Sequence, residues 1–198
     1  NNFLKKKFLI SEIKKSYLTK LKNNYLFHLA TLYNPNPKSP EEATNIIESN
    51  LLFGLRLLHS LGYDFFNKIL LTQSYLELQK SKLIDLYTQT KSIFANELEK
   101  TIPDKIIKIY LYDTFGLSDK REKLINIWLK KLILNKSVTI FSEKTKINLS
   151  SNKFISNIIT NINNIKPGKY EIRSNVEMTL SELFYFLKDI TKSKSRVI

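Results

Sequence analysis

Short apolar runs alternate along this chain with longer stretches of helical periodicity, and this alternation most constrains its fold. The apolar runs are Lys7–Ile10, Tyr25–Ala30, Lys68–Leu71, Ile106–Leu111 and Val138–Phe141. Alternation of this kind is typical of parallel strands joined by crossover helices. The sequence therefore predicts an α/β fold built on a parallel sheet.

Apolar stripes at helical spacing predict helices at about residues 40–61, 86–100, 123–134 and 179–190. Gly62 follows the first of them as a stop signal, because glycine readily takes the backbone conformation that ends a helix. Thr179 and Glu182 have the spacing of a capping box at the start of the last one. Before that helix the pattern is weak: residues 144–164 indicate a polar connection and a helix, and Gly168–Arg173 indicates a short strand.

The chain is strongly basic, with 32 Lys and Arg against 18 Asp and Glu and a formal net charge of +14. Such a charge suits nucleic acid as a partner, but it also suits an anionic nucleotide substrate. Only four of the basic residues are arginines, and the lysines are spread through every segment. This dispersion disfavours a dedicated nucleic-acid face.

The chain contains no cysteine. This excludes disulfides and cysteine-ligated metals, and it fits a reducing cytoplasm, where we expect the protein to reside. No run of about 18 apolar residues occurs, so no membrane-spanning helix and no membrane partner are expected.

Tyr87 and Lys91 begin a predicted helix, and Ser74 ends the predicted strand before it. Residues four apart share one helix face, so the phenol and the ammonium can share one pocket. A nearby ammonium favours the phenolate form of a tyrosine, whose ordinary pKa near 10 makes it a poor base at neutral pH. Tyr87 could then exchange a proton with a substrate hydroxyl, while Ser74 hydrogen-bonds the same oxygen. In a chain rich in Tyr and Lys, the alternative is a solvent-facing pair.

Several segments, in order, resemble the extended short-chain dehydrogenases/reductases, the NAD-dependent epimerases and dehydratases of nucleotide sugars. They are Phe8–Ile13, Asn24–Ala30 with its His-Leu-Ala end, Asn50–Leu58, Lys68–Ser74, Leu86–Glu97, Ile109–Gly116, Pro167–Ser174 and Thr179–Leu183. The resemblance covers nearly the whole chain. It implies that Tyr87 is the acid/base, that Lys91 tunes it and holds the nicotinamide ribose, and that Ser74, or alternatively Thr72, polarises the substrate.

The same resemblance implies binding roles for further residues. His28, Leu29 and Ala30 would lie beside the cofactor mainly through their backbone, although His28 can equally be a structural histidine. Asn50 would make a structural hydrogen bond near the site. Three residues would face the nucleotide-sugar substrate, with exposed surface positions as the alternative: Asp113, Arg121 and Arg173.

The phosphate-binding turn of the family, Gly-x-x-Gly-x-x-Gly, has no counterpart here, and Gly54 is the first glycine of the chain. We therefore expect a Rossmann-like parallel sheet missing its first strands, in a partial dinucleotide-binding domain at residues 1–120. A small α+β substrate lobe would follow at residues 121–198. NAD is the expected cofactor, with NADP as the alternative, and we expect this chain alone to bind it weakly.

The resemblance implies an oxidoreductase of the epimerase/dehydratase type that acts on a nucleotide sugar, either truncated or whole, and that forms a homodimer. Two other classes stay open. One is an inactive family member that serves as a binding or assembly protein, which the missing glycine turn favours. The other is a basic nucleic-acid-binding protein, which the net charge favours.

Overall fold

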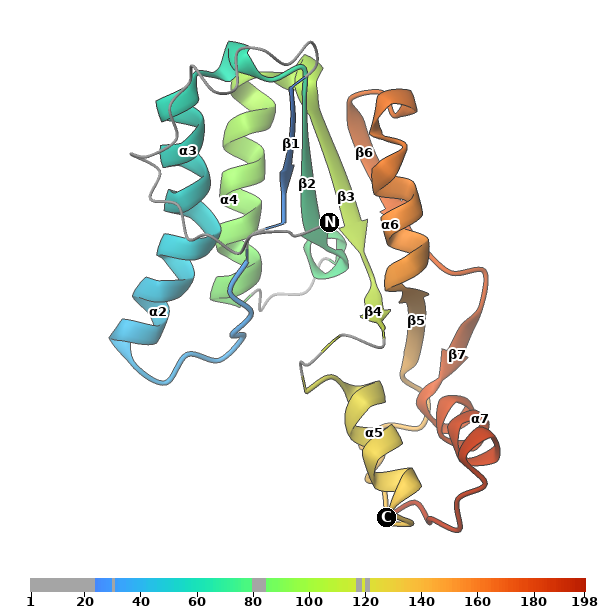
Figure 1. Cartoon of the computed structure of the whole chain (residues 1–198). Coiled ribbons are helices and arrows are strands. Elements are labelled where there is room, and N and C mark those ends of the chain that lie inside the picture. Colours follow the sequence, from blue (N-terminus) through green and yellow to red (C-terminus); the bar gives the residue numbers. More distant parts are fainter. Residues whose placement is uncertain (1–23, 30, 80–84, 117–118, 120–121) are drawn as a thin grey trace, which may run out of the picture. The chain divides into compact units, whose positions relative to one another are not determined.

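The computed structural model describes residues 24–29, 31–79, 85–116, 119 and 122–198 (Figure 1). The chain forms two compact units. The first consists of residues up to Tyr110 together with Ile162–Glu171, and the second of Leu111–Asn161 together with Ile172–Ile198. The predicted strand near Phe8 lies outside the described residues.

The first unit is built on a four-stranded sheet with the order β1-β2-β3-β6. Its strands are β1 (Tyr25–His28), β2 (Lys68–Ser74), β3 (Ile106–Leu111) and β6 (Gly168–Ile172). Strands β1 and β2 run parallel, with Tyr25 opposite Lys68 and His28 opposite Leu71. The predicted α/β fold with a parallel sheet is confirmed.

The helices of this unit begin and end at recognisable signals. They are α2 (Pro40–Ile47), a π-helical turn (Glu48–Leu52), α3 (Phe53–Leu61) and α4 (Leu86–Thr101). Ser39 caps α2 by accepting a hydrogen bond from the Glu42 amide. Gly62 ends α3 with a φ of 84°, which favours glycine. Short 3-10 turns lie at Tyr63–Phe65, Tyr75–Leu78, Pro103–Lys105 and Ile162–Asn164.

One hydrophobic core joins the helices of this unit to its sheet. Figure 1 shows α3 and α4 side by side next to β1 and β2. The buried members of this core include Leu57, Leu58, Ile69, Leu71, Phe94, Ala95, Leu98 and Ile106. The apolar stripes of α3 and α4 therefore face the strands, which fixes the position of the first turns of α4 relative to the end of β2.

Lys68 fastens the start of β2 to the segment at residues 162–165. Its ammonium donates hydrogen bonds to the carbonyl oxygens of Ile162, Asn163 and Ile165, at 3.0, 2.8 and 2.7 Å. These are carbonyls that follow or belong to a 3-10 turn, and a cation satisfies them well. The bonds help to hold a segment distant in sequence in the first unit.

The second unit is an α+β arrangement around a three-stranded sheet with the order β4-β5-β7. Its elements are β4 (Asp113–Phe115), α5 (Leu124–Ile133), β5 (Lys146–Ser151), α6 (Asn152–Thr160), β7 (Glu177–Thr179) and α7 (Leu180–Thr191). Strand β5 pairs parallel with β4 and antiparallel with β7. Trp128 of α5 and Phe184 of α7 pack edge to face in its core.

Two expectations for this unit are wrong. Val138–Phe141 is no strand: Val138 forms only an isolated bridge with Val197, and Phe141 is 95% exposed. The strand lies instead at Lys146–Ser151, within the stretch predicted to be a polar connection.

The predicted capping box is confirmed, since Thr179 and Glu182 bond to each other's backbone amides. No helix in the described part of the chain is long and apolar enough to cross a membrane.

Candidate active site

Ser74 lies at the last position of β2, as predicted, and its hydroxyl has a local hydrogen bond. The Oγ atom accepts a bond from the Leu76 amide at 3.3 Å, and the Ser74 amide donates to Glu77 Oε1 at 3.0 Å. These two bonds form a capping box that starts the 3-10 turn Tyr75–Leu78. The turn therefore fixes both Ser74 and Glu77 at the strand end.

Tyr87 and Lys91 lie in the first two turns of α4. Asp85 caps this helix by accepting a hydrogen bond from the Thr88 amide at 2.7 Å. The Lys91 ammonium lies 5.6 Å from the centre of the Tyr87 ring, a cation–π distance. The rings of Tyr33 and Tyr87 pack edge to face, with 5.0 Å between the ring centres. The predicted proximity of the Tyr87 and Lys91 side chains is thus present in the structure.

Lys91 is buried, with only 7% of its surface exposed. Desolvation lowers its pKa from 10.5 to about 8, while the charge of Glu77 acts in the opposite direction. The ammonium is therefore only moderately favoured over the neutral amine at physiological pH. A lysine in this state can gain or lose its charge when its neighbours change.

A small cavity of about 10 Å³, room for about one water molecule, lies beside Lys91. Its lining comes from both strands and helices of the first unit: His28, Asn50, Thr72, Gln73, Lys91 and Phe94. A nicotinamide ring is far too large for this space.

His28 ends β1 and faces this cavity with 8% of its surface exposed. Its ring packs on Phe94 with 4.6 Å between the ring centres. Burial, and secondarily the charge of Lys91, lowers the pKa of His28 from 6.5 to about 4. The Nε2 atom is buried and has no hydrogen-bond partner among the described residues. A Cβ atom on Gly54 would lie 2.8 Å from this nitrogen, so only glycine fits there.

Asn50 lies in the π-helical turn between α2 and α3 and is 1% exposed. Its Oδ1 atom accepts a hydrogen bond from the Leu32 amide at 2.7 Å, and its Nδ2 atom donates to the Leu32 carbonyl at 3.2 Å. A longer bond of 3.4 Å reaches Thr90 Oγ1 on α4. Asn50 thus ties the loop after β1 to the helices, the structural role expected of it. The π-helical turn is a feature often found at functional sites.

Asp113 lies in the second unit, at the start of β4. Burial raises the pKa of its carboxyl group, and the charge of Lys123 opposes this effect. The Lys123 ammonium donates to the carbonyl and the hydroxyl of Thr114, at 2.8 and 2.5 Å. It also lies 3.6 Å from Asp119 Oδ2. Asp113 therefore belongs to a charged cluster inside the second unit.

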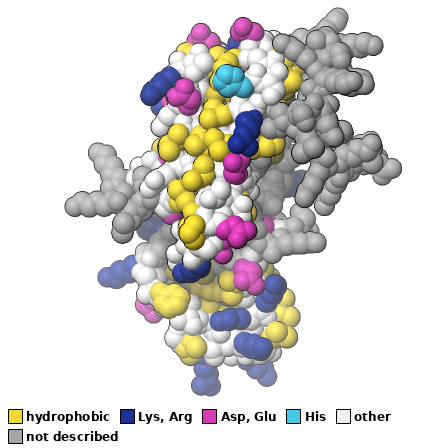
Figure 2. All heavy atoms as spheres, turned by 90° about the vertical axis from the view of Figure 1, so that its left-hand side faces the viewer, with side chains coloured by type: hydrophobic (Ala, Val, Ile, Leu, Met, Phe, Trp, Pro, Cys, Tyr) yellow, Lys and Arg dark blue, Asp and Glu magenta, His cyan; other side chains and the backbone are white. Residues whose placement is uncertain are grey.

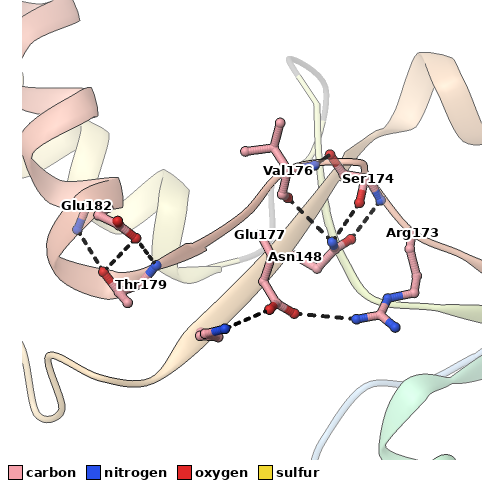
Figure 3. Close-up of polar contacts among 8 residues, drawn as sticks. Asn148, Arg173, Ser174, Val176, Glu177, Thr179 and Glu182 are labelled. Carbon is pink, nitrogen blue, oxygen red and sulfur yellow. Dashed lines mark hydrogen bonds and ion pairs between the residues drawn. The ribbon is translucent and has the colours of Figure 1, made fainter.

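Arg173 also lies in the second unit, where its guanidinium is engaged within the chain (Figure 3). It bonds to Glu177 at 3.4 Å and lies 4.9 Å from the centre of the Tyr112 ring. Asn148 of β5 supports the same loop by donating to the carbonyl of Ser174 at 2.9 Å and accepting from its amide at 2.8 Å. With its side chain half exposed, Arg173 can still meet an anionic group.

The predicted site residues are divided between the two units, and the contact between Tyr87 and Lys91 is the one described above. Ser74, Tyr87, Lys91 and the backbone of His28 and Leu29 belong to the first unit, while Asp113 and Arg173 belong to the second. Ala30 and Arg121 lie outside the described residues. No group of His, Asp and Glu suited to a metal ion occurs in the described ranges.

Glu77 is the functional candidate that the sequence prediction missed. A signal for it was present, because Ser74 and Glu77 have the spacing of a capping box. Burial raises the pKa of Glu77, and the charges of Lys91 and Lys108 oppose this effect. Gln73 was missed because its contact with Glu77 depends on the path of the chain after β2.

The residues present fit part of a nicotinamide cofactor. Lys91 offers a buried cationic donor and Tyr87 a phenol next to it, a set suited to a ribose and a reacting hydroxyl. The sequence offers no glycine-rich turn for a pyrophosphate.

Three solved structures illustrate the likeness in fold. A UDP-glucose 4-epimerase from Thermotoga maritima, solved with UDP-glucose, matches with a TM-score of 0.76 and 17% identity over 93% of this chain and 66% of its own. A dTDP-glucose 4,6-dehydratase from Streptomyces venezuelae, solved with NAD, matches at 0.71 and 14% over 93% and 64%. RMD from Pseudomonas aeruginosa, solved with NADPH, matches at 0.72 and 15% over 93% and 73%.

No family model matches the sequence. The chain spans about two thirds of the length of these structures. At such low identity the likeness concerns the fold. The described chain therefore has a Rossmann-like fold similar to that of these three structures.

Proposed function

We propose that this protein is an NAD-dependent oxidoreductase of the epimerase/dehydratase type that acts on a nucleotide sugar, and that it belongs to the extended short-chain dehydrogenases/reductases. The observation that carries the proposal is the contact between Tyr87 and the buried Lys91, whose pKa is lowered, at the start of α4. It occurs in a fold that a UDP-glucose 4-epimerase also has. Neither the pair nor the fold suffices without the other.

Tyr87 is the proposed acid/base. Its hydroxyl exchanges a proton with a hydroxyl or carbonyl oxygen of the sugar. The Lys91 ammonium favours the phenolate of Tyr87, and the Ser74 hydroxyl hydrogen-bonds the same substrate oxygen. Thr72, which lines the cavity, is the alternative to Ser74. NAD, when bound, supplies the hydride transfer.

Lys91 would hold the nicotinamide ribose, and the backbone of His28, Leu29 and Ala30 would lie beside the cofactor. NADP is the alternative, since one neighbour of this fold was solved with NADPH. We expect the 198 residues alone to bind either cofactor weakly, because phosphate binding in this fold depends on the amides of a glycine-rich turn.

Asp113, Arg121 and Arg173 are the proposed contacts of the nucleotide-sugar substrate. An arginine suits a diphosphate because its planar guanidinium can bond two oxygens at once. The neighbours that were solved with UDP-glucose and NAD support a nucleotide sugar as the substrate class.

The direct test uses the product of the complete reading frame and a panel of UDP-, dTDP-, CDP- and GDP-linked sugars with NAD or NADP. Mass spectrometry and nuclear magnetic resonance (NMR) would detect epimerised, dehydrated or reduced products. Conversion of at least one nucleotide sugar, abolished by Tyr87→Phe and retained by Tyr185→Phe, is the expected result. Tyr185 is an exposed tyrosine of α7 and serves as the matched control. Absence of any conversion would overturn the proposal.

The second candidate is an inactive member that binds or assembles without turnover. A complete gene product that also has no glycine-rich turn would favour it. It predicts no conversion and no saturable cofactor binding by the complete gene product. The same panel therefore separates the two candidates.

We also propose that the protein forms a homodimer through the helices of the first unit. Figure 2 shows hydrophobic side chains gathered along one side of that unit. Among the exposed apolar residues of its helices, Phe53 of α3 is 38% exposed and Ile93 of α4 is 53% exposed. Burial of such side chains against a second copy would remove apolar surface from water.

A further inference from the structure

We propose that Tyr33 is a positioning residue of this site. Its ring packs against the ring of Tyr87, and hydrogen bonds through Asn50 and Thr90 tie the loop that carries Tyr33 to the backbone of Tyr87. The catalytic meaning of this inference rests on the proposed function. The ring contact and the bonds that support it can be tested without any substrate.

The two tyrosine rings meet edge to face. The centres of the Tyr33 and Tyr87 rings are 5.0 Å apart, and the ring planes are inclined at 85°. This arrangement is favourable because the positive edge of one ring lies near the negative face of the other. The Lys91 ammonium also contacts Tyr87, at 5.6 Å from its ring centre. The Tyr87 ring is therefore contacted by one side chain of its own helix and by one from the loop after β1.

Burial does not explain why the Tyr33 ring stays in this place. Tyr33 is 56% exposed, and residues 31–39 around it form neither helix nor strand. Exposed loops of this kind are ordinarily more mobile than the elements that they connect. The position of the Tyr33 ring must therefore come from bonds made by its neighbours in the loop.

Polar bonds fix the residues on both sides of Tyr33. Before it, the buried Asn50 side chain accepts a hydrogen bond from the Leu32 amide at 2.7 Å and donates one to the Leu32 carbonyl at 3.2 Å. After it, Asn34 donates to the Oε2 atom of Glu42 on α2 at 3.1 Å. The loop is thus fastened immediately before and immediately after Tyr33, which limits the movement of its ring.

Asn50 also connects this loop to the backbone of Tyr87. Its Nδ2 atom donates to Thr90 Oγ1 on α4 at 3.4 Å. The Thr90 hydroxyl in turn donates to the carbonyl of Tyr87 at 3.0 Å and to that of Leu86 at 2.9 Å. Asn50 and Thr90 are both almost fully buried, so water competes little for these bonds. The two side chains therefore help to set the distance between the loop that carries Tyr33 and the helical turn that carries Tyr87.

This arrangement gives the Tyr87 ring a defined orientation. An acid/base hydroxyl must lie within hydrogen-bond reach of the substrate oxygen, and a displacement of about 1 Å can slow such a step by about a hundredfold. Tyr33 acts through its ring, so phenylalanine should replace it and alanine should not. Because Tyr33 orients a reacting group, loss of its ring should lower kcat and change KM little.

The first test is the NMR spectrum of Tyr87, recorded on protein that carries ring-labelled tyrosine and assigned with Tyr87→Phe. The wild type should show a nuclear Overhauser effect between the two rings. Tyr33→Ala should shift the Tyr87 ring signals because it removes a neighbouring aromatic ring, and Tyr33→Phe should keep them near their wild-type positions. Tyr185→Ala, at an exposed position of α7, is the matched control and should leave them unchanged. Unchanged Tyr87 signals in Tyr33→Ala would overturn the inference.

A pair of threonine substitutions tests the link through Asn50. Thr90→Val keeps the shape of the side chain and removes the hydroxyl that bonds to the Tyr87 carbonyl. We expect it to weaken the Overhauser effect between Tyr33 and Tyr87. Thr88→Val is the matched control, because Thr88 is also buried on α4 and its hydroxyl has no hydrogen-bond partner among the described residues. Equal effects of the two substitutions would contradict the proposed link.

Turnover by the product of the complete reading frame tests the catalytic meaning. Tyr33→Ala should lower kcat by about tenfold with KM nearly unchanged, and Tyr33→Phe should keep most of the rate. If Tyr87→Phe abolishes conversion while Tyr33→Ala keeps the wild-type kcat, the positioning role is wrong and the proposed function stands. If no nucleotide sugar is converted, the proposed function fails, and the NMR spectra alone decide whether Tyr33 orients Tyr87.

Discussion

At the scale of single residues, two residues that line one small cavity of the first unit, His28 and Lys91, have lowered pKa values. The sequence could predict the Tyr87–Lys91 pair, because a spacing of four on a helix fixes two side chains on one face. It could not predict that Lys91 is buried, since burial depends on strands and loops far away in the chain.

His28 should make the fold sensitive to acid. Its pKa is about 4 in the folded chain and 6.5 ordinarily, so the unfolded chain binds a proton in this range that the folded chain does not. Stability is therefore fully present above pH 6.5 and is lost as the pH falls toward 4. We expect this effect to amount to about 3 kcal/mol, at about 1.4 kcal/mol per pKa unit.

Urea unfolding of the wild-type protein and of His28→Asn at pH 7 and pH 4 measures the effect. The stability advantage of the wild type should shrink by about 3 kcal/mol at the lower pH. His59→Asn, at an exposed position of α3, provides the matched control and should show no comparable dependence on pH. A difference between wild type and His28→Asn that stays constant with pH would show that His28 is not held neutral.

At the scale of elements, local signals placed most helices well but did not reveal strand β5 of the second unit. Helix α7 could be predicted because Thr179 and Glu182 carry a local capping signal. Strand β5 could not, because its buried residues include Asn148 and Ser150, which hide the apolar pattern of a strand. Asn148 is tolerated there because the backbone of a distant loop satisfies its amide.

Removal of the Lys68 ammonium should weaken the attachment of residues 162–165 to the start of β2. Lys68→Met keeps the length of the aliphatic chain and removes three bonds to carbonyl oxygens. We expect the free energy of unfolding to fall by about 2 kcal/mol, as for hydrogen bonds that involve a charged group. Lys105→Met is the control, since its bonds are longer, at 3.3 and 3.4 Å. Urea unfolding curves in which the two variants lose the same stability would contradict this role.

At the scale of the whole molecule, the fold matches enzymes of 14 to 17% identity over 93% of this chain. The order of apolar runs and helices could predict this fold, because the fold depends on which positions are apolar and buried rather than on the identity of each residue. The return of Ile162–Glu171 to the first unit could not be predicted, since it is a long-range arrangement. The division of cofactor and substrate roles between residues 1–120 and 121–198 stays a prediction, because it concerns binding.

Ile93 tests the proposed dimer. A charge at this exposed position of α4 should prevent burial against a second copy, so Ile93→Glu should convert dimers to monomers. Sedimentation velocity measures the change. Ile190→Glu on α7, which is 59% exposed, is the matched control and should leave the dimer intact. Monomeric wild-type protein, or a dimer that survives Ile93→Glu, would contradict the proposed interface.

Turnover by Tyr87→Phe tests the central claim most directly. The substitution removes one hydroxyl and keeps the ring that packs against Tyr33 and Lys91. In the product of the complete reading frame, with a nucleotide sugar that it converts, we expect kcat to fall by about a hundredfold or more, the usual contribution of acid/base catalysis. Thermal stability and NAD affinity should stay near those of the wild type. Retention of most of the wild-type kcat would show that Tyr87 is not the acid/base and that the site lies elsewhere.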